Sequence, residues 1–181
     1  MYSAFCSFML RMIGWKITGE YPYHIKKFII VVIPHTSNWD FPLGLLIRGS
    51  IRQNITFFAK DSLFKFPFGG LFRWLGGVPV DRSKSTNFVD AVVDIYNNTE
   101  KMATVISPEG TRSKVETLKS GFYYIAKGAK IPIILCKFDY ENREVYFEKP
   151  FYPTEDKDAD FQHFKDFFKD VKGKNPELGW P

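Results

Sequence analysis

Residues 27–33, KFIIVVI, constrain the fold more than any other part of this sequence. The run is unbroken, apolar and rich in β-branched side chains, which is typical of a strand buried on both faces. Such strands lie at the centre of parallel sheets that carry helices on both sides. Other apolar runs predict further strands over residues 54–60, 78–80, 102–107, 131–138 and 144–150.

Helical patterns lie between most of these strands. Residues 40–53 predict a helix with Asp40 as its N-cap and Pro42 in its first turn. The other predicted helical segments are 61–77, in short pieces broken at Pro67 and Gly69-Gly70, then 85–98, 119–128, closed by Gly128, and 157–171. The last two strands predict a hairpin. At 181 residues, the chain predicts one α/β domain over residues 1–181, with a largely parallel or mixed central sheet flanked by helices.

The two ends of the chain carry weaker signals. Within residues 1–20, a helix over about 2–13 is mostly apolar, with Ser3, Ser7 and Arg11 on one polar stripe. This fits a helix at a membrane interface and, equally, a helix packed on the domain. No run reaches the roughly 18 uncharged apolar residues of a membrane span, and no signal peptide is predicted. Residues 172–181 lack a period and predict an irregular tail.

Basic charge is concentrated in residues 41–85. This segment carries seven Lys and Arg against two Asp, in a chain whose net charge is +5. Aromatic residues, 18% of the chain, are interleaved with these cations. The combination fits an anionic membrane surface, a phosphorylated substrate or single-stranded nucleic acid. A solvated cationic face without a partner fits it as well.

Disulfide and metal chemistry have little support in the sequence. Cys6 and Cys136 are the only cysteines, so there is no disulfide framework and a reducing compartment is favoured. Cys136 ends an apolar run and is predicted to be a buried small hydrophobe. His24, His35 and His163 are scattered without metal-ligand spacing, so no metal site is predicted.

The polar stretch after residues 27–33 reads PHTSNWD and places His35 five positions before Asp40. On one straight helix these side chains would point about 140° apart. If His35 leaves a strand and Asp40 opens a helix, the turn can bring them together. A carboxylate on one imidazole nitrogen then leaves the other free to take a proton from a hydroxyl. Taken alone, the pattern more often describes a loop histidine and a capping aspartate.

Three more polar stretches follow predicted strands. Residues 107–112, SPEGTR, offer Glu109 as an acceptor for substrate hydroxyls, Gly110 for close backbone approach and Arg112 as a fork for phosphate. Lys60 and Arg82 also come directly after apolar runs. Because ligands of α/β sheets bind beyond the carboxyl ends of the strands, we expect these groups on one rim with the histidine. Each one alone could be a solvated surface residue.

In order, the stretches PHTSNWD, FAKDSLFKFPFGGLFRWLGGVPVDRS, SPEGTR and IPIILC resemble the lysophosphatidic acid acyltransferase family (1-acylglycerol-3-phosphate O-acyltransferases). The resemblance covers about residues 27–140 and implies a glycerolipid acyltransferase-like fold. It implies that His35 is the general base and Asp40 its orienting partner. The residues it assigns to the acceptor's polar head are Lys60, Arg82, Glu109, Gly110, Thr111 and Arg112, with Pro132 near the acyl chain. Ser107 departs from the family, where an aromatic residue is more usual.

The resemblance also implies the partners of the enzyme. They are a membrane surface, a lyso-lipid acceptor and an acyl thioester on coenzyme A or acyl carrier protein, with no cofactor and no nucleic acid. The expected location is peripheral, on the cytoplasmic side of the membrane. The first candidate acceptor is 1-acylglycerol-3-phosphate, and a lyso-amino-acid lipid or a lysoglycolipid is the alternative.

We expect direct acyl transfer without a covalent intermediate, because the sequence has no G-x-S-x-G elbow. The aromatic stretch 57–75 is expected to supply an apolar groove, and backbone amides at the start of the 40–53 helix are candidate oxyanion donors. Two rivals stay open. A thioesterase would use His35 and Asp40 on water, and a non-enzymatic membrane-binding or nucleic-acid-binding module would not need His35.

Overall fold

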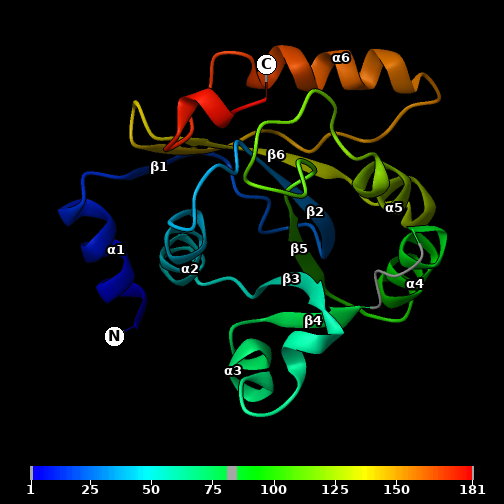
Figure 1. Cartoon of the computed structure of the whole chain (residues 1–181), viewed down its shortest axis with the longest axis horizontal. Coiled ribbons are helices and arrows are strands. Elements are labelled where there is room, and N and C mark those ends of the chain that lie inside the picture. Colours follow the sequence, from blue (N-terminus) through cyan, green and yellow to red (C-terminus); the bar gives the residue numbers. More distant parts are fainter. Residues whose placement is uncertain (1, 81–84, 181) are drawn as a thin grey trace.

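Seven strands form one mixed sheet in the computed structural model (Figure 1), which describes residues 2–80 and 85–180, without the side chains of residues 60 and 85–87. The strand order is β1-β7-β6-β2-β5-β3-β4. All neighbouring strands are parallel except β6 and β7, which pair antiparallel as the predicted hairpin. The strands are β1 (Lys16–Gly19), β2 (Lys27–Ile33), β3 (Ile55–Lys60), β4 (Gly77–Val80), β5 (Met102–Ile106), β6 (Ile133–Asp139) and β7 (Glu144–Phe147). The predicted α/β domain with a mixed central sheet is confirmed.

Strand β2 lies in the middle of the sheet, between β6 and β5. Successive side chains of a strand point to opposite faces. Alternate residues of β2 accordingly belong to two hydrophobic clusters, with Ile29, Val31 and Ile33 in one and Phe28, Ile30 and Val32 in the other. Both faces are covered, which is why this run is continuously apolar rather than alternating.

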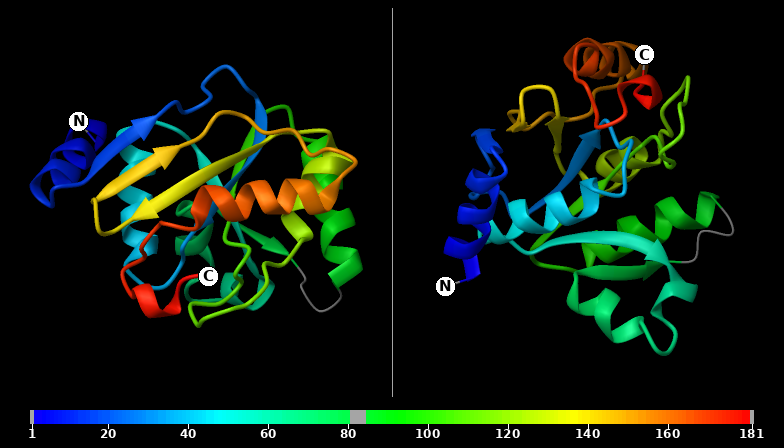
Figure 2. Two further views of the ribbon diagram at one scale, coloured as in Figure 1. Left: turned by 90° about the horizontal axis from the view of Figure 1, so that it is seen from above. Right: turned by 60° about the vertical axis from the view of Figure 1, so that its left-hand side comes forward.

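Helices cover the two faces of the sheet (Figure 2). The cluster that contains Ile29 packs against α4, α5 and α6, and the cluster that contains Ile30 packs against α1 and α2. The helices are α1 (Tyr2–Met12), α2 (Asp40–Ser50), α3 (Gly69–Trp74), α4 (Ser85–Asn97), α5 (Gly121–Ala129) and α6 (Lys157–Phe168), with 3-10 turns η1 (Asp61–Phe64) and η2 (Pro176–Leu178).

Three helix ends differ from the sequence-based prediction. Asp40 is the first residue of α2 rather than its N-cap; the cap position is Trp39, without a side-chain hydrogen bond. The carboxylate of Asp40 is engaged elsewhere, as described below. Helix α5 continues past Gly128, and the chain reverses at Lys130, which has a φ of 53°. Gly69 begins α3 instead of interrupting a helix.

Helix α1 packs against α2. The Ser3 hydroxyl donates to the carbonyl of Ser50 (3.2 Å), and the hydroxyls of Ser7 and Ser50 are 2.8 Å apart. The serines of the predicted polar stripe therefore face the protein. Large apolar side chains of α1 point outward and are more than half exposed: Tyr2, Phe5, Phe8 and Met12. None of the helices in the described part of the chain is both long and apolar enough to cross a bilayer.

Candidate active site

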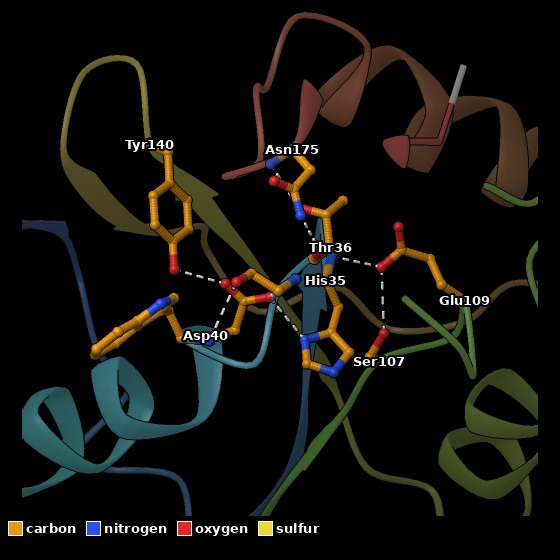
Figure 3. A network of polar contacts seen from close by, with 9 residues as sticks. His35, Thr36, Asp40, Ser107, Glu109, Tyr140 and Asn175 are labelled. Atoms are coloured by element: carbon orange, nitrogen blue, oxygen red, sulfur yellow. Dashed lines mark hydrogen bonds and ion pairs between the residues drawn. The ribbon is translucent and has the colours of Figure 1, made fainter. Parts of the chain in front are cut away.

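His35 and Asp40 meet at the carboxyl end of β2. His35 lies two residues beyond the end of the strand, and Asp40 begins α2, so the intervening turn brings the two side chains together (Figure 3). The distance from His35 Nδ1 to Asp40 Oδ2 is 2.9 Å. The predicted convergence of this pair is confirmed. Because a carboxylate only accepts hydrogen bonds, Nδ1 is the nitrogen that donates to Asp40, which leaves Nε2 as the nitrogen that can accept a proton.

The Asp40 carboxylate is buried and accepts hydrogen bonds on both of its oxygens. Oδ2 accepts the backbone N–H of Ser37 (3.0 Å) in addition to His35, and Oδ1 accepts the hydroxyl of Tyr140 (2.6 Å). The Asp40 side chain is 4% exposed, whereas that of His35 is 27% exposed. The imidazole is therefore accessible, while the carboxylate that orients it is shielded from water.

Glu109 supports the backbone of the histidine. It lies in the turn after β5, and its Oε2 accepts the backbone N–H of His35 (2.7 Å) and the hydroxyl of Ser107 (3.2 Å) (Figure 3). Burial raises the pKa of Glu109, and the two hydrogen bonds and the neighbouring imidazole oppose that rise. The side chain is 3% exposed. The buried carboxylate thus braces the loop, and the role expected for Glu109 toward substrate hydroxyls stays a prediction.

The rest of the SPEGTR stretch lies at the surface beside this site. Gly110 has a φ of 67°, a conformation that favours glycine, and a Cβ there would come within 2.5 Å of Lys119 Nζ. Thr111 and Arg112 are exposed, and the Thr111 hydroxyl accepts the backbone N–H of Ser113 (3.3 Å). The ammonium of Lys119 is thus a cation at the site that the sequence did not single out.

Three predicted residues remain, and the structure describes them to different extents: Lys60, Arg82 and Pro132. Lys60 ends β3 at the same edge of the sheet as the end of β2, but its side chain is outside the description. Arg82 lies outside the described residues. Pro132 is buried before the amino end of β6, where its carbonyl accepts the N–H of Ile29 (3.1 Å). That is the opposite end of the sheet from His35, so the expected place near an acyl chain is not supported.

A cavity of about 1180 Å³ includes His35 and Asp40 in its lining. Most of the other lining side chains are apolar. One group comes from α2 and the sheet beneath it and from the end of α3: Phe41, Gly44, Leu45, Ile47, Phe57 and Leu75. A second group comes from β3, β5, α4 and α5: Phe58, Phe88, Val89, Ile106 and Phe122. The expected contribution of the 57–75 stretch is therefore limited to its two ends, and α2 supplies more of the wall.

The C-terminal tail is irregular but contacts the loop that carries the histidine. The Asn175 amide donates to the carbonyl of Thr36 (2.8 Å), and its backbone N–H donates to the Thr36 hydroxyl (3.2 Å) (Figure 3). Trp180 Nε1 donates to the carbonyl of Glu116 (3.2 Å), in the loop that follows Arg112. The tail thus ties together the two loops that form the site.

Lys119, Tyr140 and Asn175 are site residues that the sequence analysis missed. Asn175 has no periodic or motif signal. Tyr140 closely follows the predicted strand 131–138, so the rule that strand ends share one rim could have placed it near His35.

The described part of the site offers neither a reactive cysteine nor a group of metal-ligating side chains. Cys136 is fully buried, as predicted, and burial raises the pKa of its thiol, so it is an inert packing residue. In residues 2–80 and 85–180, no three His, Cys, Asp or Glu side chains gather in a way that could hold a metal ion.

A protein-family model described as Acyltransferase matches residues 15–138, well over half of the sequence. The chain belongs to the acyltransferase family. The crystal structure of the 1-acyl-sn-glycerophosphate (LPA) acyltransferase PlsC from Thermotoga maritima has a similar fold, with a TM-score of 0.62 and 19% sequence identity over 93% of this chain and 75% of that chain. No curated protein matches significantly. The prediction of an acyltransferase enzyme is confirmed, and the chain has the fold that the resemblance to the lysophosphatidic acid acyltransferases implied.

Proposed function

We propose that this acyltransferase moves a fatty acyl group from an acyl thioester, on coenzyme A or acyl carrier protein, to the hydroxyl of a lyso-lipid. The first candidate acceptor is 1-acylglycerol-3-phosphate. One observation carries the proposal: the Nε2 side of an imidazole oriented by a buried carboxylate lies at a large, mostly apolar cavity. The similar fold of a lysophosphatidic acid acyltransferase supports the same reaction class.

In the proposed mechanism, Nε2 of His35 removes the proton of the acceptor hydroxyl as its oxygen attacks the thioester carbonyl. The carbon–sulfur bond then breaks, and the protonated His35 returns the proton to the departing thiolate. Asp40 stabilises the imidazolium through its 2.9 Å hydrogen bond to Nδ1. The reaction exchanges one acyl bond for another, so it needs no redox partner.

The start of α2 is a poorer source of oxyanion donors than the sequence suggested. The backbone N–H of Ser37 donates to Asp40, that of Trp39 donates to the Ser37 hydroxyl (3.2 Å), and that of Asp40 donates to the Ser37 carbonyl (3.3 Å). These amides organise the turn, and Pro42 has no N–H to offer. The developing oxyanion would therefore need a donor other than these three amides.

The acyl chain of the donor is proposed to lie beneath α2. The cavity wall there is formed by Phe41, Gly44, Leu45 and Phe57, and burying each methylene group of a chain against such a wall contributes about 0.8 kcal/mol. Arg112 and Lys119, with Lys60 and Arg82, are proposed to attract a phosphorylated head group to the site.

The membrane surface is proposed to contact α1 and the η1–α3 region. Phe66 is 98% exposed and Trp74 is 76% exposed, and large apolar side chains also protrude from α1. Lys65 and Arg73 lie among the exposed aromatics of the η1–α3 region and suit anionic lipids. The guanidinium of Arg48 on α2 donates to the carbonyl of Leu75, directly after α3, while α1 packs on α2. Both surfaces therefore adjoin the helix that covers the proposed acyl site. The proposed location, peripheral on the cytoplasmic side of the membrane, is the one that the family resemblance implies.

The test is a comparison of His35→Ala with His24→Ala. His24 is an exposed histidine before β2, so its loss controls for the removal of a ring without touching the site. We expect a loss of about 100-fold or more in the transfer of a labelled acyl group to lyso-lipid for His35→Ala, and no loss for His24→Ala. Near-normal turnover of His35→Ala would end the assignment of a general base.

Two further measurements identify the substrate. Release of free fatty acid from the thioester, with no lipid product, would replace transfer by the thioesterase function. Arg112→Ala should raise the KM for a phosphorylated acceptor more than kcat falls. An unchanged KM would favour a lyso-amino-acid lipid or a lysoglycolipid as the acceptor, and mass spectrometry of products from a mixed lyso-lipid extract would identify it.

A further inference from the structure

Tyr140 contacts the carboxylate of the site from a distant part of the chain. Its hydroxyl donates to Asp40 Oδ1 at 2.6 Å, across 100 positions of sequence (Figure 3). This length is typical of a hydrogen bond from a hydroxyl to an ionised carboxylate, which is about twice as strong as one between neutral groups. The other oxygen, Oδ2, serves His35 and the amide of Ser37. Tyr140 is therefore the hydrogen-bond donor that the structure gives to Oδ1.

The hydroxyl of Tyr140 is not needed to build the hairpin that carries it. The turn between β6 and β7 is closed by Asp139, whose carboxylate accepts the backbone N–H and the side-chain amide of Asn142 (3.1 and 2.7 Å). The ring of Tyr140 packs edge-on against Trp15 with centroids 4.8 Å apart, and its backbone N–H donates to the carbonyl of Lys172 (2.9 Å). Ring and backbone are thus held independently of the hydroxyl, which is directed at Asp40.

We propose that Tyr140 is a positioning residue for acyl transfer: its hydroxyl fixes the rotation of the Asp40 carboxylate and limits the negative charge that this carboxylate presents to His35. The proposal rests on the proposed function of the histidine. Tyr140 does not touch the substrate and acts only through Asp40. A carboxylate held at both oxygens keeps Oδ2 aimed at Nδ1, so Nε2 stays aimed at the cavity.

The electrostatic consequence has a definite sign. Two titratable side chains contact the pair or its loop directly: Tyr140 from the end of β6 and Glu109 from the turn after β5. The lining of the same cavity also contains charged residues, namely Arg48, Asp90 and Lys119. Burial, followed by the hydrogen bond and the charge of Asp40, raises the pKa of the Tyr140 hydroxyl, so it stays a donor at neutral and alkaline pH. Without that donor the carboxylate would hold a protonated imidazole more strongly. The base form of His35 would then be reached only at higher pH.

Tyr140→Phe tests the proposal, because it removes the hydroxyl and keeps the ring on Trp15. The matched control is Tyr123→Phe. The Tyr123 hydroxyl also donates to a buried carboxylate, that of Asp160 (2.9 Å), but it belongs to the contacts between α5 and α6. Both variants lose one hydrogen bond to a buried aspartate, and only one of those aspartates lies at the site.

We expect Tyr140→Phe to lower kcat about three- to thirty-fold with KM values within about two-fold, and to move the acid limb of the pH–rate profile upward by about half a unit or more. Tyr123→Phe should lower the unfolding temperature and leave kcat, KM and the pH–rate profile unchanged. A Tyr140→Phe enzyme with wild-type kcat and pH profile would overturn the proposal. If His35→Ala is inactive at the same time, the proposed function stands and only the role of Tyr140 fails.

A second measurement does not depend on activity. In the wild-type protein, NMR of the imidazole should show the Nδ1 proton of His35 in its hydrogen bond to Asp40. This resonance should shift in Tyr140→Phe and stay in place in Tyr123→Phe. Identical imidazole spectra for wild type and Tyr140→Phe would overturn the proposal even if the variant were poorly active.

Discussion

Gly44 offers a direct test of where the acyl chain lies. It sits in the middle of α2 and lines the cavity, and a Cβ built on it would meet no atom within 4 Å. A leucine side chain at this position therefore fits without a clash at its Cβ and would extend into the space proposed for the acyl chain. We expect Gly44→Leu to fold, since replacing a helical glycine by leucine favours the helix by about 0.8 kcal/mol.

The size of the effect follows from the volume that the new side chain occupies. A leucine side chain has four carbon atoms and should displace about three methylene groups of the chain, each of which contributes about 0.8 kcal/mol when buried. Long thioesters would lose about 2.4 kcal/mol relative to chains short enough to end before Gly44. This corresponds to about a 60-fold change in the ratio of kcat/KM values.

The assay measures kcat/KM for a series of saturated acyl thioesters with one acceptor. The control is Gly70→Leu on α3, another helical glycine with no atom within 4 Å of a built Cβ and outside the cavity lining. Gly44→Leu should shift the preference to shorter chains, and Gly70→Leu should not. An unchanged preference in Gly44→Leu would refute the placement of the acyl chain beneath α2.

Three predictions concern the framework around the site. Burial raises the pKa of Glu109, so its contribution to stability is present below the unfolded value of about 4.3 and is lost as the pH rises through the raised folded value. The stability of Glu109→Gln relative to wild type in urea unfolding should therefore increase as the pH rises above about 4, and a constant difference would contradict this. Asn175→Ala removes the donor to the buried Thr36 carbonyl and should cost about 1–3 kcal/mol, whereas Asn98→Ala, which removes an exposed amide, should cost less in the same assay. Gly49→Ala would place a Cβ against α1 and should cost about 1–3 kcal/mol; thermal unfolding equal to that of wild type would show that the α1–α2 packing is loose.

Much of the fold could be predicted because its signals are local. The apolar run of β2 identifies a central strand, and every other predicted strand forms at nearly its predicted position. The helix ends at Asp40 and Gly128 were misplaced, since caps depend on which hydrogen bonds compete for the same groups. The side chain of Asp40 is taken by the site, and the turn after α5 falls at Lys130 instead.

In the candidate site, too, contacts between residues close in sequence were easier to predict than contacts between distant residues. His35 and Asp40 are five residues apart, so a strand end followed by a helix start allows them to meet, and the resemblance to the family favoured that reading over a loop histidine and a capping aspartate. Glu109 reaches His35 across 74 positions, and no local pattern predicted that its buried carboxylate would hold the backbone of the histidine loop. Pro132 was placed from a motif alone, and the direction of β6 puts it at the far end of the sheet.

By itself, the sequence determined the class of fold, the turn that joins the imidazole to the carboxylate, and the family. The first two depend on hydrophobic periodicity or short spacings, which act within a few residues, and the family rests on the resemblance of four motifs in order over about residues 27–140. The tertiary structure alone decided that the Tyr140 hydroxyl donates to Asp40 from 100 positions away, that Asn175 contacts the histidine loop from 139 positions away, and that a cavity opens beneath α2. Such contacts depend on how strands are ordered and helices packed in space, and no local pattern of residues carries that information.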